Sequence, residues 1–176
     1  MGKFRIFSGY IVLAIFAAGL FGAVHDQISY TVSSEYYVKF KFHQFGLLNG
    51  AVPERIRAAE VGVLASWWMG IPLGVFTGAA GFLHRTADQM RHVLLLSLPL
   101  VVGFVLFFAL GGLAYGYFQT SGIDLGTYRG WYLPPGLEHP RAFLCVAYMH
   151  NSAYLGGALA IPVAWIFHLI IKRRTS

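Results

Sequence analysis

Long apolar stretches alternate with polar ones along the whole chain. Four apolar segments extend over about 4–24, 61–83, 93–118 and 142–171. Each matches or exceeds the roughly 20 residues that a helix needs to cross the hydrocarbon core of a bilayer. The pattern predicts an all-α integral membrane protein, in which residues 1–176 form a single membrane domain built as a bundle of four transmembrane helices.

The links between these segments differ in length and character. Two long links, about 25–60 and 119–141, are predicted to form an ordered extracytoplasmic cap. Within the first, residues 35–45 mix aromatic side chains with lysines in neither helical nor strand period, which favours a segment lying on the membrane interface. The short link contains Thr86 and Gln89, a capping box that predicts a helix start at Ala87.

The distribution of basic residues predicts the orientation of the bundle. Lysines and arginines are packed into short segments at one side, which contains Lys3, Arg5, Arg85, Arg91, Lys172, Arg173 and Arg174. On the other side they are diluted over the two long loops, where they count less. We expect both termini to be cytoplasmic, in a bacterial-type inner (plasma) membrane.

Composition supports this assignment and narrows the partners. The chain is 57% hydrophobic and 11% charged, against about 25% charged residues in soluble domains. The net charge of +6 comes from residues at the ends of apolar segments, so it predicts contact with lipid headgroups and no nucleic acid. The single cysteine, Cys145, excludes an internal disulfide and a cysteine-based metal site.

Small residues recur at every fourth position of the second segment. They are Gly62, Ser66, Gly70, Gly74 and Gly78, a spacing that lets helices approach closely in lipid. Because such a stripe drifts about 40° per step, it predicts either a right-handed crossing or several different partners. Oligomerisation, or packing against partner subunits of a larger membrane complex, would use these glycine-rich faces.

The titratable residues that could carry chemistry gather on the outer side. Six of the seven acidic residues are placed there: Asp26, Glu35, Glu54, Glu60, Asp124 and Glu138. His150 is the most notable histidine, because it lies roughly 12 Å below the outer end of its helix, a depth at which ionisable residues mark functional sites. The alternative is a plain hydrogen bond between helices.

A metal site is the chemistry that this asymmetry predicts. His25, Asp26 and Glu60 are expected at the outer ends of the first two helices, with Glu35 nearby and His150 deeper. Histidine and carboxylate ligands together suit zinc, iron or manganese, and bundle cores house such sites. The predicted ligands are His25, Asp26, Glu35, Glu60 and His150, and the chemistry would be redox or hydrolytic.

Two alternatives stay open. A non-catalytic subunit of a larger complex would need only the small-residue stripes. A b-type haem carrier would need two histidines at matching depth: His25 and His150 are expected to differ by around 12 Å, whereas His84 and His168 match better on the inner side. His84, Asp88 and His92 recur every fourth residue, but we expect them in a solvated turn.

Overall fold

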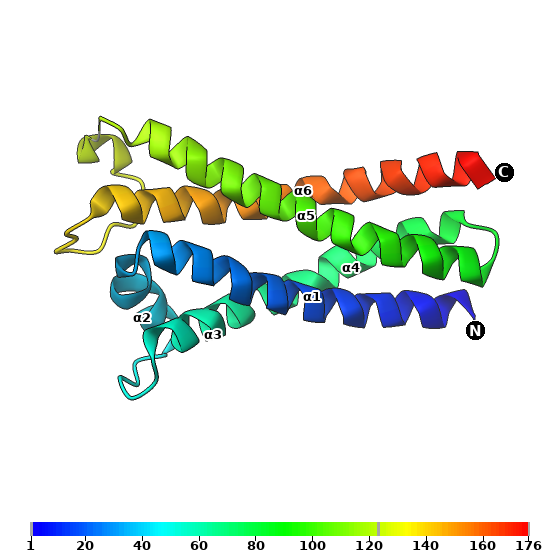
Figure 1. The fold of residues 1–176 in the computed structure, drawn as a ribbon, viewed down its shortest axis with the longest axis horizontal. Helices are drawn as coiled ribbons and strands as arrows, with labels where there is room; N and C mark the ends of the chain where they lie inside the picture. The colour runs from blue at the N-terminus through cyan, green and yellow to red at the C-terminus, as the bar shows by residue number, and fades with distance from the viewer. Residues whose placement is uncertain (1, 123, 176) are drawn as a thin grey trace.

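Long helical stretches, four in the described residues, lie side by side, and both chain termini lie at the same end of the molecule (Figure 1). The computed structural model describes residues 2–122 and 124–175, and these contain helices and turns but no strand. The elements are α1 (Lys3–Val32), η1 (Tyr37–Lys41), α2 (Phe42–Phe45), α3 (Glu54–Ser66), η2 (Trp67–Met69), α4 (Gly70–Ala79), η3 (Ala80–Leu83), α5 (Ala87–Gln119), η4 (Leu125–Tyr128) and α6 (Pro140–Thr175).

Four of the helical stretches are long and apolar enough to cross a membrane. They are Lys3–Val32, Glu54–Leu83, Ala87–Gln119 and Pro140–Arg174. Each contains one of the predicted segments, so the all-helical bundle is confirmed. The helices extend beyond the apolar segments, most clearly in α1, which continues past residue 24 to Val32. These extra turns carry polar side chains, which hydropathy alone assigns to a loop.

The second stretch changes its helix type in the middle. Trp67–Met69 forms a short 3₁₀ segment between α3 and α4. Pro72 follows closely; it has no N–H to donate to the carbonyl of Trp68, and such a loss breaks or kinks a helix. The stretch is therefore composed of two rods, and Figure 1 shows α3 and α4 following different lines past α1.

The glycine stripe of this stretch faces a single neighbour, α1. A Cβ atom added at Gly62 would clash with the carbonyl of Gly22, one at Gly70 with the backbone at Ile15, and one at Gly78 with the ring of Tyr10. Of the two expected arrangements, a right-handed crossing or several partners, the structure does not show the second, because α1 is the neighbour along the whole stripe. Because the stretch is broken into α3 and α4, each rod can present its own glycines to α1.

The α5–α6 pair forms the other half of the bundle and uses small residues in the same way. Added Cβ atoms would clash with Ser152 at Gly112 and with Phe108 at Gly156. The most extensive helix contacts are α5 with α6 and α1 with α3 and α4. Most of the glycine faces thus pack against other helices of the same chain, whereas Gly103 and Gly111 of α5 have open space around them.

The predicted capping box at the start of α5 is confirmed. The Thr86 hydroxyl accepts a hydrogen bond from the N–H of Gln89, and the Gln89 side chain accepts one from the N–H of Thr86. Residues 35–45 fold mainly into η1 and α2, and Tyr36, Tyr37 and Phe42 are buried in a core with Phe143 and Val146. This segment lies at the end of the bundle opposite the two termini (Figure 1), and its position on a membrane interface stays a prediction.

Candidate metal centre

Two neighbouring residues of α1, His25 and Asp26, form the base of the site. Both side chains are buried, with 3% of each residue exposed. They lie inside α1 and not in a loop, because the helix continues to Val32. This continuation places His25 about 10 Å below the outer end of α1.

His150 of α6 meets this pair from the opposite half of the bundle. Since α6 begins at Pro140, His150 lies about 15 Å from the outer end of its helix. The rings of His25 and His150 are 4.6 Å apart between centroids, and Nε2 of His150 is 3.9 Å from Oδ1 of Asp26. The expected difference in depth between the two histidines is therefore wrong, because α1 is longer than its apolar segment.

The three residues form a group that could hold a metal ion. One potential ligand atom from each lies within 4.8 Å of the others. Three polar atoms of this group are buried without a hydrogen-bond partner, namely Nε2 of His25, Oδ2 of Asp26 and Nε2 of His150. Buried polar atoms are nearly always paired with protein groups or water, so water or an ion could bind at these three atoms. We call these residues the His25–Asp26–His150 cluster.

A hydrogen bond inside the cluster joins the side chains of His25 and Asp26. Nδ1 of His25 lies 2.9 Å from Oδ1 of Asp26. In the tautomer in which Nδ1 donates to the carboxylate, Nε2 of His25 keeps a free lone pair. A carboxylate that orients a histidine in this way is the common outer-shell partner in metal sites. Nε2 of His25 could therefore hold a metal ion.

Aromatic side chains pack against the two histidines of the cluster. The ring of Tyr36 stacks on the ring of His150 at 5.1 Å and 12°, and Phe21 contacts His25. The hydroxyl of Tyr37 is hydrogen-bonded to that of Ser29, one turn beyond Asp26 on α1. Burial, and then the Asp26 carboxylate, raise the pKa of both the Tyr36 and the Tyr37 phenols, so these groups stay neutral near the cluster.

Sequence reasoning missed Tyr36 because its segment fits neither a helical nor a strand period. The segment contains a π-helix over Tyr37–Lys41. In this helix the N–H of Phe42 bonds to the carbonyl of Tyr37, and these two aromatic residues share the buried face. Short π segments are frequent at functional sites, and the five-residue spacing of Tyr37 and Phe42 was the signal available in the sequence.

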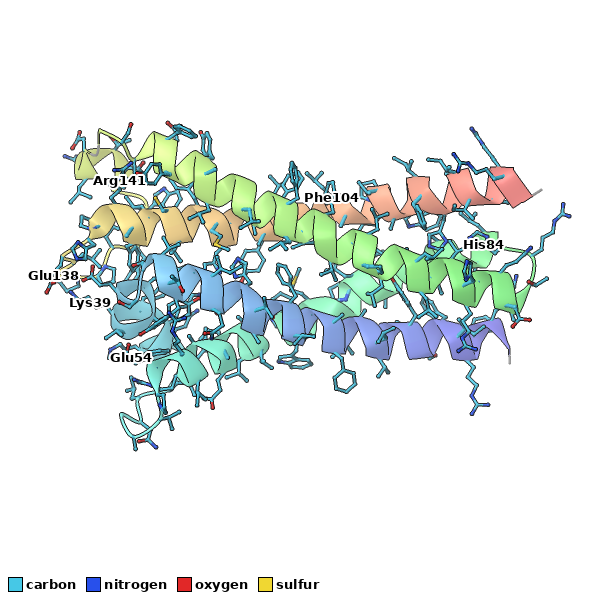
Figure 2. All side chains as sticks on the ribbon, viewed as in Figure 1. Lys39, Glu54, His84, Phe104, Glu138 and Arg141 are labelled. Atoms are coloured by element: carbon cyan, nitrogen blue, oxygen red, sulfur yellow. The ribbon has the colours of Figure 1, made fainter. Side chains whose placement is uncertain are left out.

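Glu35 lies outside the cluster, where its side chain contacts the backbone just before α6. Its carboxylate accepts hydrogen bonds from the N–H groups of Glu138 (3.0 Å) and His139 (2.8 Å), and forms an ion pair with Lys39 at 2.7 Å. Figure 2 shows Lys39 and Glu138 together at this end of the bundle. Burial disfavours the carboxylate, but these three partners outweigh it and lower the pKa of Glu35 to about 2.

Glu60 also lies away from the cluster. It is exposed on α3, and the cluster draws its one carboxylate from Asp26. Of the five predicted ligands, the structure thus brings together His25, Asp26 and His150.

The end of the bundle at which both termini lie contains a second histidine pair. His84 and His168 are buried, and Nε2 of His84 lies 3.0 Å from Nδ1 of His168. His84, labelled in Figure 2 at the end opposite Lys39, therefore does not lie in a solvated turn, although Asp88 and His92 are exposed. In both histidine pairs the rings are in direct contact, which leaves no space for a porphyrin between them.

The cluster lies at one end of a cavity between the two halves of the bundle. This central cavity has about 880 Å³ of empty space, including its mouth, and extends along α1 from Asp26 to Tyr10. Residues of α3, α4, α5 and α6 form its other walls.

Comparison of the chain with known protein families, curated proteins and solved structures found no match.

Proposed function

We propose that this chain is an integral membrane protein that binds a divalent transition-metal ion in the His25–Asp26–His150 cluster. The observation that carries the proposal is the set of three unpaired, buried ligand atoms within one small group. A metal ion held by one ligand atom of each residue would give these buried groups a partner. It would also neutralise the charge of the buried Asp26 carboxylate, and buried charge is costly unless it is paired.

The ligand types define the metals and the chemistry that fit. Two histidines and one carboxylate suit zinc, and the same set binds non-haem iron(II) with open positions for substrate. Manganese accepts the same carboxylate and imidazole donors. Three protein ligands leave at least one position for water or substrate, as catalytic zinc sites do. The ion would polarise a substrate oxygen or activate water, and iron would add redox chemistry.

The proposed membrane orientation places the cluster on the extracytoplasmic side. Support comes from the four apolar spans and from the basic segments at the end where both termini lie. Many large apolar side chains are exposed along the helices, among them Phe16, Phe107 and Ile166. A lipid environment would cover these side chains, which water would not.

Metal analysis of the purified full-length protein tests the proposal. We expect one ion per chain after growth in metal-supplemented medium, and an affinity at least about tenfold lower in Asp26→Asn and His150→Gln, in line with the cost of disturbing metal sites. His168→Gln is the control, since it removes a buried histidine outside the cluster. Wild-type protein without stoichiometric metal, or full binding in both cluster variants, would contradict the proposal.

A non-catalytic role in a larger membrane complex is a separate proposal with its own surface. A partner helix would pack on the face of α5 that points away from the bundle. On this face Gly103 and Gly111 have open space around them, and Phe107 and Leu110 are exposed. A native mass well above 19.5 kDa with foreign subunits present would support it. A metal-free monomer would contradict both proposals.

A further inference from the structure

The central cavity is long and narrow. Its volume is about 110 Å³, and the empty space including its open mouth is about 880 Å³. The distance along α1 from Asp26 to Tyr10 is about 24 Å at 1.5 Å per residue. The space is therefore distributed along the helices, as a long chain would need.

The walls of the cavity offer almost no free hydrogen-bonding groups away from the cluster. The Tyr10 hydroxyl is hydrogen-bonded to Thr77 (3.2 Å) and Ser97 (3.4 Å), and Thr77 donates to the carbonyl of Leu73 at 2.6 Å. Ser66 donates to the carbonyl of Ala18 at 2.9 Å. The remaining walls are chiefly aliphatic side chains and glycines. Water needs two to four polar partners to be held, so most of this space favours hydrocarbon.

The polar end of the cavity favours an anionic head. With a divalent ion bound, the two neutral histidines and the Asp26 carboxylate leave one net positive charge. Nζ of Lys41 lies 5.8 Å from the ring of Tyr36, which stacks on His150, and adds another positive charge nearby. Buried positive charge is stabilised when a negative group pairs with it. A carboxylate would supply that charge and an oxygen for the open metal position.

We propose that the central cavity binds a free long-chain fatty acid, with its hydrocarbon chain between the helices and its carboxylate at the metal in the His25–Asp26–His150 cluster. The position of the head rests on the function proposed above, whereas the position of the chain rests on the cavity alone. The cavity is partly open, and Tyr154 both lines it and is about half exposed. A ligand from the bilayer can enter beside Tyr154.

Gly157 allows the cavity to be filled without disturbing the cluster. It lines the cavity, and an added Cβ atom would meet only Leu73, at 3.9 Å, so Gly157→Leu directs a side chain into free space. Ala158→Leu is the matched control, because Ala158 is the next residue on α6 and is exposed.

Photolabelling of the full-length protein in nanodiscs tests the inference. A diazirine-bearing palmitic acid should label residues that line the cavity, and mass spectrometry would locate them. We expect labelling to fall at least about tenfold, or 1.4 kcal/mol in affinity, in Gly157→Leu and to stay unchanged in Ala158→Leu. Metal content should be the same in both variants. Chelation of the metal should weaken labelling of the wild-type protein.

Three results would overturn the inference: no labelling of cavity residues, equal labelling of Gly157→Leu and wild type, or stronger labelling by a diazirine phosphatidylcholine than by the fatty acid. If metal-loaded protein shows no labelling of the cavity, the fatty-acid proposal is wrong and the metal-site proposal is unaffected. Cavity labelling that depends on Gly157 in protein without metal would remove the metal site and leave the position of the chain.

Discussion

The ring of Tyr36 lies parallel to the ring of His150, with 5.1 Å between centroids and 12° between planes. Tyr36 precedes the short helix η1, whereas His150 belongs to α6. The contact joins the segment of residues 35–45 to His150 of the His25–Asp26–His150 cluster.

Loss of this ring should weaken metal binding without abolishing it. An aromatic pair contributes about 0.5–1.5 kcal/mol beyond its area burial, so Tyr36→Leu should lower zinc affinity roughly two- to tenfold. Tyr36→Phe keeps the ring and should bind as the wild type does. Competition with a chromophoric zinc chelator measures both. Equal affinities of Tyr36→Leu and Tyr36→Phe would show that stacking does not position His150.

Glu35 should make the stability of the fold depend on acidic pH. Its pKa is lowered from 4.5 to about 2 in the folded protein, so the folded state binds this proton more weakly than the unfolded state does. The resulting stabilisation is complete above about pH 4.5 and is lost as the pH falls towards about 2. Thermal unfolding measured across this range should show a steeper decline for the wild type than for Glu35→Gln. Glu60→Gln, at an exposed carboxylate, should follow the wild type.

The contact between Gly22 and Gly62 should tolerate no side chain. A Cβ atom at Gly62 would clash with the backbone of Gly22, and overpacking of this kind costs about 1–3 kcal/mol. Gly62→Ala should therefore unfold at a lower SDS fraction than the wild type. Gly103→Ala, where nothing lies within 4 Å, should be neutral or gain up to about 1 kcal/mol from helix propensity. Similar stabilities of the two variants would contradict the close approach of α1 and α3.

The proposed orientation predicts which cysteines a membrane-impermeant maleimide can reach. Gly50→Cys, in the exposed outer loop, should be modified in intact spheroplasts, and Asp88→Cys, at the start of α5, only after lysis. The native Cys145 is buried and should give little background. Modification of Asp88→Cys before lysis, with protection of Gly50→Cys, would reverse the orientation and place the cluster on the cytoplasmic side.

The sequence predicted the helices more completely than the site. Hydropathy located all four helical stretches, and the Thr86 capping box gave the exact start of α5, because both signals are local. The meeting of His25 with His150 is not local. It depends on the last turns of α1, whose polar residues such as Asp26 and Gln27 resemble a loop in composition but are held in helix by their contacts.

The same reason explains the errors at both ends of the bundle. His84 follows the last turn of its helix and looks solvated in the sequence, yet it is buried because His168, far along the chain, lies against it. The charge of Glu35 and its place in the sequence predict a metal ligand. Its partners, the N–H groups of Glu138 and His139, are backbone groups, which no pattern of side chains reveals.

The position of His150 on the last helix has a consequence for biosynthesis. His25 and Asp26 leave the ribosome early, whereas His150 follows only after α5 has been made, so the ligand set is complete only when the whole chain has assembled. A metal ion that needs all three residues binds the finished fold and not its precursors, and it shifts the equilibrium towards that fold by mass action. The supply of metal in the cell would then control how long each molecule survives quality control.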